Sequence, residues 1–186
     1  MLEEEACLQQ FLGDNLELEI INVKHNPLKD EDIKAIVSIE LHPDVRKWLP
    51  DYAYEDFDKE FKDYKKFFQD LQNNNKVEVL VARVNGRIVG FLALWRMVEY
   101  EEHVRSIGVS VHPDYRKKGI ATKLVKKAIE LAKELGAKKL IIETLEENIA
   151  MRRVAEKLKF KLEYVRRSRE FKDGSRHNEY VYLLSL

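Results

Sequence analysis

The residues best suited to chemistry lie in one basic segment with a single glycine, Val111 to Ala121. Three consecutive cations, Arg116, Lys117 and Lys118, directly precede Gly119. An apolar helical pattern begins at Ile120. A helix N-terminus presents unpaired N–H groups and about half a positive charge, which suits a phosphate. Glycine has no Cβ to obstruct an approaching anion. The predicted phosphate contacts are Arg116, Lys117, Lys118, Gly119, Ile120, Ala121 and Thr122.

Two common phosphate motifs do not match this loop. A P-loop needs Lys and then Ser or Thr after its last glycine, whereas Ile120 and Ala121 follow Gly119. A Rossmann fingerprint needs three spaced glycines. The pattern Val-x-Pro-x-x-Arg-x-x-Gly-x-Ala, from Val111 to Ala121, instead resembles the acyl-CoA-binding motif of the GNAT superfamily of N-acetyltransferases. In that family the loop amides hold the CoA pyrophosphate.

A second segment, Asn148 to Phe160, resembles the family pattern Asn-x-x-Ala-x-x-Leu-Tyr-Glu-Lys-x-Gly-Phe. It departs at Ala155, where many members have a catalytic tyrosine, and at Lys159, where glycine is usual. The resemblance covers roughly residues 77–184 and is nearest to the group that acetylates ribosomal-protein N-termini and polyamines. It implies an α/β GNAT fold, with a mixed central sheet splayed between its fourth and fifth strands and flanked by helices.

The resemblance also implies how the cofactor lies. The pantetheine arm of CoA would occupy the gap between the splayed strands, where Val109 and Val111 offer backbone groups as an added strand would. A backbone N–H near Val109 would stabilise the oxyanion of the tetrahedral intermediate. Asn148 would bind the arm from the opposite side, cap its own helix, or do both.

An amine acceptor arrives protonated, with a pKa near 10, so a base must take its proton. Glu143 is the candidate base, assisted by a water, because it lies at the end of the strand beside the gap. An ordinary ion pair is the alternative for this carboxylate. The rival bases are Glu101, Glu102 and His103. The general acid stays open among a water, Ser106 and a tyrosine from elsewhere, since Ala155 cannot protonate the thiolate.

Hydrophobic periodicity predicts the elements that position these residues. Strands are expected at residues 16–23, 77–81, 88–95, 104–111, 139–144, 162–171 and 176–184. Helices are expected at 30–41, 45–49, 54–73, 120–135 and 148–158. The aromatic stripe of the 54–73 helix is predicted to face the core, with the wall of an acceptor channel as the alternative. Its residues are Phe57, Phe61, Tyr64, Phe68 and Leu71. Residues 1–186 are expected to form one domain, with an N-terminal helical extension over 1–15.

Composition limits the function classes. The 186 residues carry 33 Lys and Arg against 33 Asp and Glu, which favours neither nucleic acid nor an anionic membrane as partner. The single Cys7 excludes an internal disulfide, and no apolar run reaches the roughly 20 residues of a membrane span. A cytoplasmic protein is expected. The five histidines have no metal-ligand spacing, so no metal is expected. A homodimer is left open.

The sequence therefore predicts transfer of an acetyl group from acetyl-CoA to a primary amine, by direct attack in a ternary complex. The amine would be a protein N-terminus, a polyamine or a small amine. A longer acyl-CoA donor and a catalytically weak CoA-binding or regulatory module are the alternatives. Acidic residues near the acceptor side favour a cationic amine. They are Asp51, Glu55, Asp56, Asp58, Glu60, Asp63, Glu99, Glu101 and Glu102.

Overall fold

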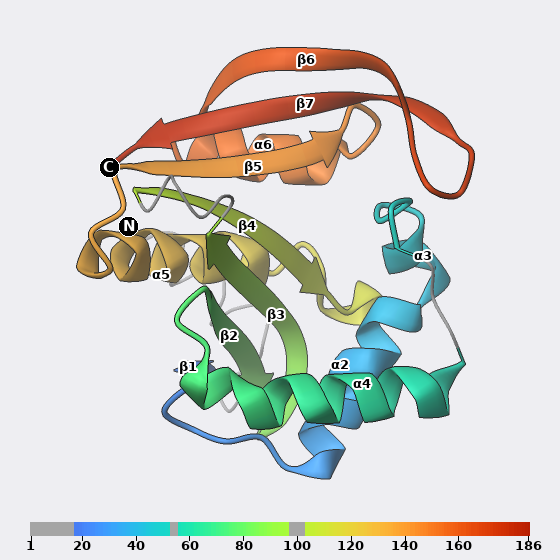
Figure 1. The fold of residues 1–186 in the computed structure, drawn as a ribbon, viewed down its shortest axis with the longest axis vertical. Helices are drawn as coiled ribbons and strands as arrows, with labels where there is room; N and C mark the ends of the chain where they lie inside the picture. Colours follow the sequence, from blue (N-terminus) through green and yellow to red (C-terminus); the bar gives the residue numbers. More distant parts are fainter. Residues whose placement is uncertain (1–16, 53–55, 97–102) are drawn as a thin grey trace.

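The computed structural model describes residues 17–52, 56–96 and 103–186 (Figure 1). The strands are β1 (Leu18–Asn22), β2 (Val77–Val84), β3 (Arg87–Arg96), β4 (Val104–Val111), β5 (Lys139–Leu145), β6 (Lys161–Glu170) and β7 (Arg176–Ser185). The α-helices are α2 (Asp30–Leu41), α3 (Pro43–Arg46), α4 (Phe57–Asp70), α5 (Ile120–Glu134) and α6 (Ile149–Lys157). Two 3₁₀ turns, η1 (Leu71–Asn73) and η2 (Pro113–Tyr115), complete the described elements.

The strands form one seven-stranded sheet in the order β1-β2-β3-β4-β5-β7-β6. The neighbours β4 and β5 run parallel, and the other pairs are antiparallel. Parallel pairing covers only Val104–Ile107 against Lys139–Ile142. Beyond it the two strands diverge, as Figure 1 shows, with β4 continuing to Val111 and β5 to Leu145. This opening is called the fork below, and it confirms the predicted splay.

Each face of the sheet carries its own apolar cluster. On one face α5 and α6 pack over the strands, through buried residues that include Leu124, Ala128, Ile142, Ala155 and Tyr182. On the other face α2, α3 and η1 contribute Ile36, Ile39, Val45 and Leu71 to a second cluster. Helix α4 packs beside α2 on this second face (Figure 1). The fork therefore opens between two differently covered faces.

Local signals explain where the elements begin. Asn85 and Gly86 adopt φ of 50° and 77°, the left-handed pair that a tight hairpin between β2 and β3 requires. The helical turn expected at 45–49 starts earlier, at Pro43, because the His42 side chain accepts the Asp44 N–H. Helix α4 starts at Phe57 because the Asp56 side chain accepts the Lys59 N–H.

The prediction that the aromatic stripe is core is wrong for Phe57, which is 37% exposed. Tyr64 and Phe68 are half-buried against the second cluster, and Leu71 is fully buried. Helix α4 lies at the outside of the molecule, so only part of its stripe can reach the sheet. The expected 1–15 extension, Tyr54, Glu55 and the acidic residues Glu99, Glu101 and Glu102 lie outside the described residues. Within the described part, no helix is long and apolar enough to cross a membrane.

Candidate active site

The loop after β4 is built to deliver a helix N-terminus to the fork. The His112 side chain accepts the Asp114 N–H and starts η2, with Pro113 at its first position. The backbone then turns through Lys117, with φ 59°, and Gly119, with φ 73°. A residue with a Cβ is strained in this left-handed region, which explains the glycine directly before α5.

The N-terminus of α5 presents free backbone donors. Its first helical bond runs from the Lys123 N–H to the Gly119 carbonyl at 3.0 Å, so the N–H groups from Gly119 to Thr122 have no helical acceptor. Gly119, the N-cap residue, has no side chain that could cap them. Helix α6 differs, because the Asn148 Oδ1 accepts the Met151 N–H at 3.2 Å. Asn148 is thus a helix cap, and its Nδ2 is the remaining donor.

The three cations of the loop have different surroundings. Arg116 braces the loop, since its Nε donates to the Val111 carbonyl at 3.3 Å and its Nη2 to the Asp44 carbonyl of α3 at 3.1 Å. The Lys118 Nζ lies 5.1 Å from the centre of the Tyr115 ring, a cation–π contact. Lys117 is exposed. Positive charge therefore surrounds the open N-terminus of α5.

The end of β4 turns backbone groups toward the fork. The His112 N–H donates to the Val89 carbonyl on β3 at 2.8 Å. Because backbone groups alternate sides along a strand, Val109 and Val111 direct their N–H and C=O groups away from β3 and toward the fork. The bond from Arg116 Nε to the Val111 carbonyl agrees with that orientation.

Gly108 and Trp95, which the sequence analysis did not select, lie where the fork opens. A Cβ built on Gly108 would stand 3.2 Å from Cη2 of Trp95, so the indole packs on the backbone of β4. Parallel pairing of β4 ends one residue earlier, at Ile107. A glycine inside a strand often marks such a close approach, and this was the signal in the sequence.

Glu143 stands on β5 just past the last residue that pairs with β4, opposite Val181 of β7. Its side chain is 25% exposed, and its Oε1 accepts from Arg166 Nη1 at 2.6 Å. Thr144 and Leu145 follow it in β5, so Glu143 lies two residues before the strand end rather than at the end itself. The arginine partner, on the edge strand β6, was not predicted.

Arg166 begins a chain of alternating charges on the face of the sheet that carries Glu143. The same Nη1 contacts Oε2 of the nearly buried Glu179 at 2.6 Å. Glu179 also binds Arg169, whose Nη2 donates to Asp51 at 2.6 Å. Burial lowers the pKa of Arg166, but the bonds with Glu179 and Glu143 outweigh it and leave the pKa raised. We call these five residues the charge ladder.

The charge ladder links the sheet to the segment after α3. The Asp173 N–H donates to the Pro50 carbonyl at 3.2 Å, next to the Asp51–Arg169 contact. In Figure 1 the β6–β7 hairpin reaches over the open end of the fork toward α3. With three carboxylates and two guanidinium groups, the ladder carries a formal charge of −1. Its Glu143 end lies on β5 beside the fork.

The position of the family's usual acid and the side chains that could replace it are buried. Ala155 is 0% exposed, and Ser106 is 1% exposed with its hydroxyl 3.4 Å from the Ile141 carbonyl. Burial raises the pKa of Tyr182, whose hydroxyl donates to Glu156 at 3.1 Å. Arg152 is bound to the Glu146 carbonyl at 3.0 Å, so its guanidinium braces the start of α6. His103 is exposed at the far end of β4.

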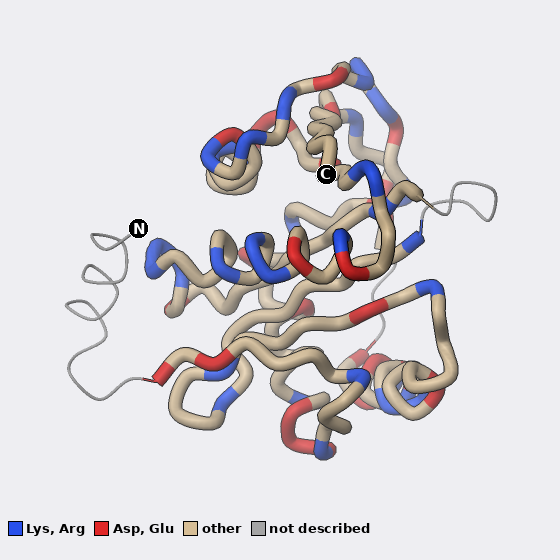
Figure 2. Tube along the Cα trace, turned by 90° about the vertical axis from the view of Figure 1, so that its left-hand side faces the viewer, with Lys and Arg blue, Asp and Glu red and all other residues tan. Residues whose placement is uncertain are grey.

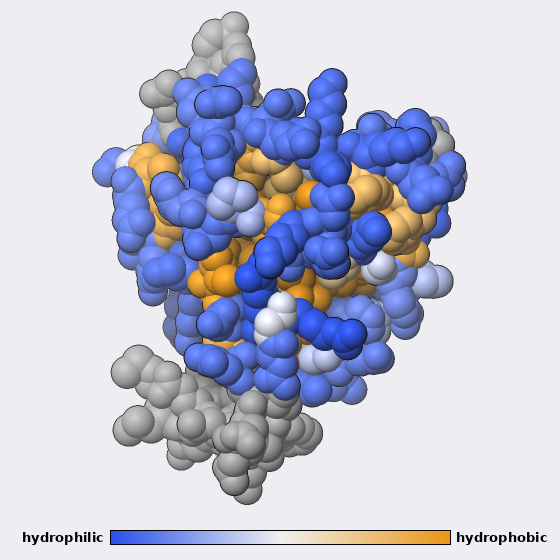
Figure 3. All heavy atoms as spheres, turned by 90° about the horizontal axis from the view of Figure 1, so that it is seen from below, coloured by the Kyte–Doolittle hydropathy of each residue, from blue (hydrophilic) through white to orange (hydrophobic). Residues whose placement is uncertain are grey.

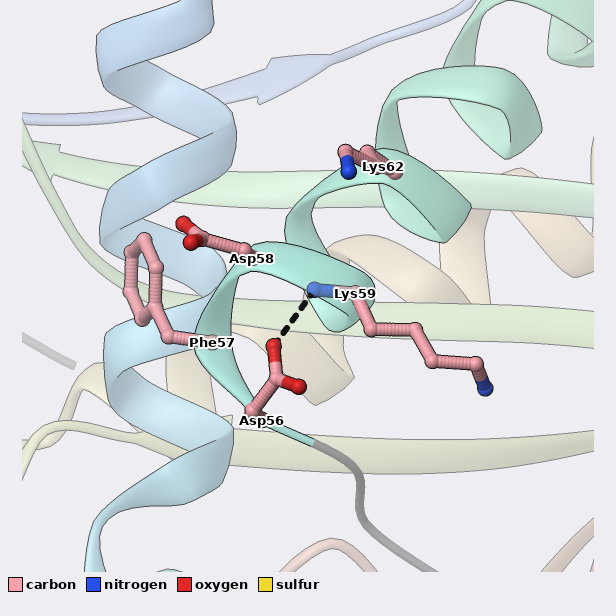
Figure 4. A pocket seen from close by; sticks show the side chains of 5 residues that line it. All are labelled: Asp56, Phe57, Asp58, Lys59 and Lys62. Carbon is pink, nitrogen blue, oxygen red and sulfur yellow. Dashed lines mark hydrogen bonds between the residues drawn. The ribbon is translucent and has the colours of Figure 1, made fainter.

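A separate hollow of about 530 Å³ lies on the first turn of α4 (Figure 4). Its lining residues are Asp56, Phe57, Asp58, Lys59 and Lys62. Figure 3, which views the molecule from the side of α4 and α2, shows hydrophobic residues between hydrophilic ones. Figure 2, a view from another side, shows Lys and Arg interspersed with Asp and Glu along the Cα trace. Among the described residues, no group of three His, Cys, Asp or Glu could hold a metal ion.

Comparisons with known proteins agree with this geometry. An uncharacterized N-acetyltransferase of Methanocaldococcus jannaschii is 31% identical over 134 residues, which are 68% of this chain but only 57% of that protein. A putative ribosomal protein bS18-alanine N-acetyltransferase of Bacillus subtilis is 24% identical over 61% of this chain and 64% of its own length.

Solved structures share the fold at lower identity. A putative acetyltransferase of Salmonella typhimurium, solved with its cofactor acetyl-CoA, superposes with a TM-score of 0.73, at 22% identity, covering 91% of this chain and 94% of its own. Spermidine N-acetyltransferase of Vibrio cholerae, solved with CoA and spermine, gives 0.72 at 18% identity, covering 93% and 96%. Residues 42–160 match the acetyltransferase (GNAT) family. The chain therefore belongs to the GNAT family of acetyltransferases.

Proposed function

We propose that the protein transfers an acetyl group from acetyl-CoA to a primary amine by direct attack. The observation that carries the proposal is the fork of β4 and β5 beside the uncapped N-terminus of α5. An extended thioester can lie in such a gap while its phosphates meet the helix N-terminus. Family membership and the relatives named above as N-acetyltransferases support this reaction class.

Each part of CoA has a proposed partner. The N–H groups from Gly119 to Thr122, including those of Ile120 and Ala121, hold the pyrophosphate, and Lys117 and Lys118 supply countercharge. Arg116 acts mainly as a brace, because its Nε and Nη2 donate to the backbone carbonyls of Val111 and Asp44. Backbone groups of Val109 and Val111 bind the pantetheine arm. Asn148 contributes its Nδ2, since its Oδ1 caps α6.

The reaction needs two protons removed from the nitrogen, one before the attack and one after it, and one charge stabilised. Glu143 takes the ammonium proton through a water, and the free amine attacks the thioester carbon. The N–H of Val109 stabilises the resulting oxyanion. The nitrogen then gives up its second proton to solvent water as the C–S bond breaks, which leaves a neutral amide. The CoA thiolate, derived from a thiol with a pKa near 8.5, leaves without a dedicated acid and takes a proton from solvent. No covalent enzyme intermediate is required.

The acceptor class follows from the relatives and the charge ladder. One of these proteins is named for alanine of a ribosomal protein and another for spermidine, and the amino groups of both are cationic at neutral pH. A ladder with a formal charge of −1 is compatible with such acceptors. A protein N-terminus, a polyamine or a small amine is therefore the proposed substrate. The competing function is CoA binding without efficient turnover, which the buried Ala155 at the usual tyrosine position favours.

The experiment combines turnover with cofactor binding. The full chain is mixed with acetyl-CoA and either spermidine or an alanine-terminated peptide, and release of free CoA thiol is followed. We expect amine-dependent release, together with calorimetric binding of CoA that Gly119→Val weakens at least tenfold, because a β-branched residue resists the left-handed turn and crowds the phosphate. CoA binding without amine-dependent release would favour the binding module. Unchanged CoA affinity in a folded Gly119→Val variant would reject the loop as the phosphate site.

A further inference from the structure

A bulge in β6 aims two arginines at one carboxylate. Arg166 and Arg169 are three residues apart, a spacing that would place them on opposite faces of a regular strand. The pairing of β6 with β7 shifts between them, and Ser168 adopts φ 49° with its N–H bonded to Asn178 Oδ1 at 3.0 Å. Bulges commonly re-aim side chains in this way. Both guanidinium groups consequently contact Glu179.

Arg166 is held more firmly than the carboxylate that it contacts at the fork. Its Nη1 binds the 7% exposed side chain of Glu179, and its Nη2 donates to the Tyr164 hydroxyl at 2.9 Å. Glu179 is fixed in turn by Arg169. Glu143 has Arg166 as its ion-pair partner and projects from β5 beside the gap. The guanidinium can therefore act as a fixed point that determines where the Glu143 carboxylate lies.

We infer that Arg166 is a positioning residue of the acceptor site, which holds the Glu143 carboxylate at the fork. The inference rests on the role proposed above for Glu143. A glutamate side chain has three rotatable bonds, and a misplacement of about 1 Å at a reacting group can cost about a hundredfold in rate. Glu179, Arg169 and the bulge at Ser168 support Arg166 in this task, because they fix the guanidinium from the side away from the fork.

A double-mutant cycle tests the inference. Amine-dependent release of CoA is measured at saturating acetyl-CoA for wild type, Arg166→Met, Glu143→Gln and the double variant, with spermidine or an alanine-terminated peptide as acceptor. We expect Glu143→Gln to lower kcat by about 10²- to 10⁴-fold, because it removes the base, and Arg166→Met to lower it by about 10- to 100-fold, because it only misplaces the base. The double variant should be no slower than Glu143→Gln, because Arg166 acts through Glu143. Arg166→Lys, which keeps a cationic donor, should recover part of the rate.

Controls separate positioning from a purely structural role. Arg167→Met removes an exposed arginine one residue away and should leave kcat unchanged. Calorimetry should give wild-type affinity for CoA in every variant, and thermal unfolding should show which variants are folded. If Arg166→Met does not fold, the cycle is run with Arg166→Lys. This change should lower kcat in the wild-type background but should lower it no further when Glu143→Gln is already present.

The outcomes are distinguishable. If the two reductions in kcat multiply in the double variant, Arg166 does not act through Glu143. That result would overturn the inference and leave the proposed role of Glu143 intact. A Glu143→Gln variant with full turnover would remove both the proposed role of Glu143 and the inference that depends on it. An Arg166→Met variant that is folded and fully active would overturn the inference alone.

Discussion

At the scale of single residues, the chemistry of Glu143 depends on its neighbours. Its position past the pairing of β4 with β5 gives it access to the gap, and Arg166 gives it a fixed counterion. Gly108 lies on the neighbouring strand β4, and the indole of Trp95, from β3, lies against this glycine. A carboxylate on one side of a gap and directed backbone N–H groups on the other side are what amine acetylation requires.

We expect Glu143→Gln to lower kcat much more than it weakens acetyl-CoA binding. General-base assistance is worth about 10²- to 10⁴-fold, and the amide cannot accept the proton. The loss should shrink as the pH rises toward the amine's pKa near 10, because more acceptor is already deprotonated. Rates across pH 6 to 10 and calorimetry with CoA provide the measurement. A ratio to wild type that stays constant over this range would argue against proton removal by Glu143.

Residue-level prediction succeeded where the signal is local in the chain. The turn at Gly119, the cap at Asn148 and the hairpin at Asn85 each depend on a few adjacent residues. The contact of Glu143 with Arg166 could not be predicted in that way. It joins residues 23 positions apart in sequence, and it depends on β7 lying between β5 and β6. The bulge at Ser168 adds a change of face that an alternating pattern does not reveal.

At the scale of elements, alternation located the strands to within a few residues, since one apolar face must pack on a helix layer. The family resemblance, rather than the pattern, supplied the splay between the fourth and fifth strands. The exposed Phe57 shows the limit of helical periodicity, because a stripe can be longer than the surface that it covers. Helix α4 touches α2 along only part of its length, and one polar contact there is informative.

That contact joins Glu40 of α2 to the Tyr64 hydroxyl of α4. Burial is the main reason that the pKa of Glu40 is raised above its ordinary value of 4.5, and the Tyr64 bond opposes this shift. When the pKa of an acid is raised in the folded state, the free energy of unfolding of the protein falls as the pH rises through that pKa. We therefore expect Glu40→Gln to raise Tm relative to wild type at pH 7 and to give a smaller gain, or none, at pH 4.

Thermal unfolding of wild type and Glu40→Gln between pH 4 and 8 is the measurement, because glutamine can still accept from Tyr64 but has no charge to bury. Glu31→Gln, on the exposed face of the same helix, is the matched control and should show little dependence on pH. An advantage of Glu40→Gln that declines as the pH rises would contradict the linkage.

At the scale of the whole molecule, the formal net charge is zero, so any selection of acceptor by charge must come from local fields. Several acidic residues considered for this role already have partners. Asp51 binds Arg169, Asp56 caps α4, and Asp63 lies 3.8 Å from Lys59. Among the described residues, the local field on the proposed acceptor side is therefore weaker than the sequence alone suggests. The −1 charge of the ladder and Asp58 remain as contributors to it.

We expect a cationic amine to be preferred over an anionic one, and the preference to fall with salt. Competition between spermidine and glutamate as acceptors, at about 0.01 M and 0.1 M salt, covers a change of screening length from about 30 Å to about 10 Å. Asp58 and Lys62 line the same hollow on α4. If that surface guides the acceptor, Asp58→Asn and Lys62→Gln should shift the preference for spermidine over glutamate in opposite directions. Both are exposed, so neither should alter CoA affinity. A preference for glutamate at both salt concentrations would contradict a cationic acceptor. A preference for spermidine that does not change with salt would place the selection at short range, in the charge ladder beside the fork.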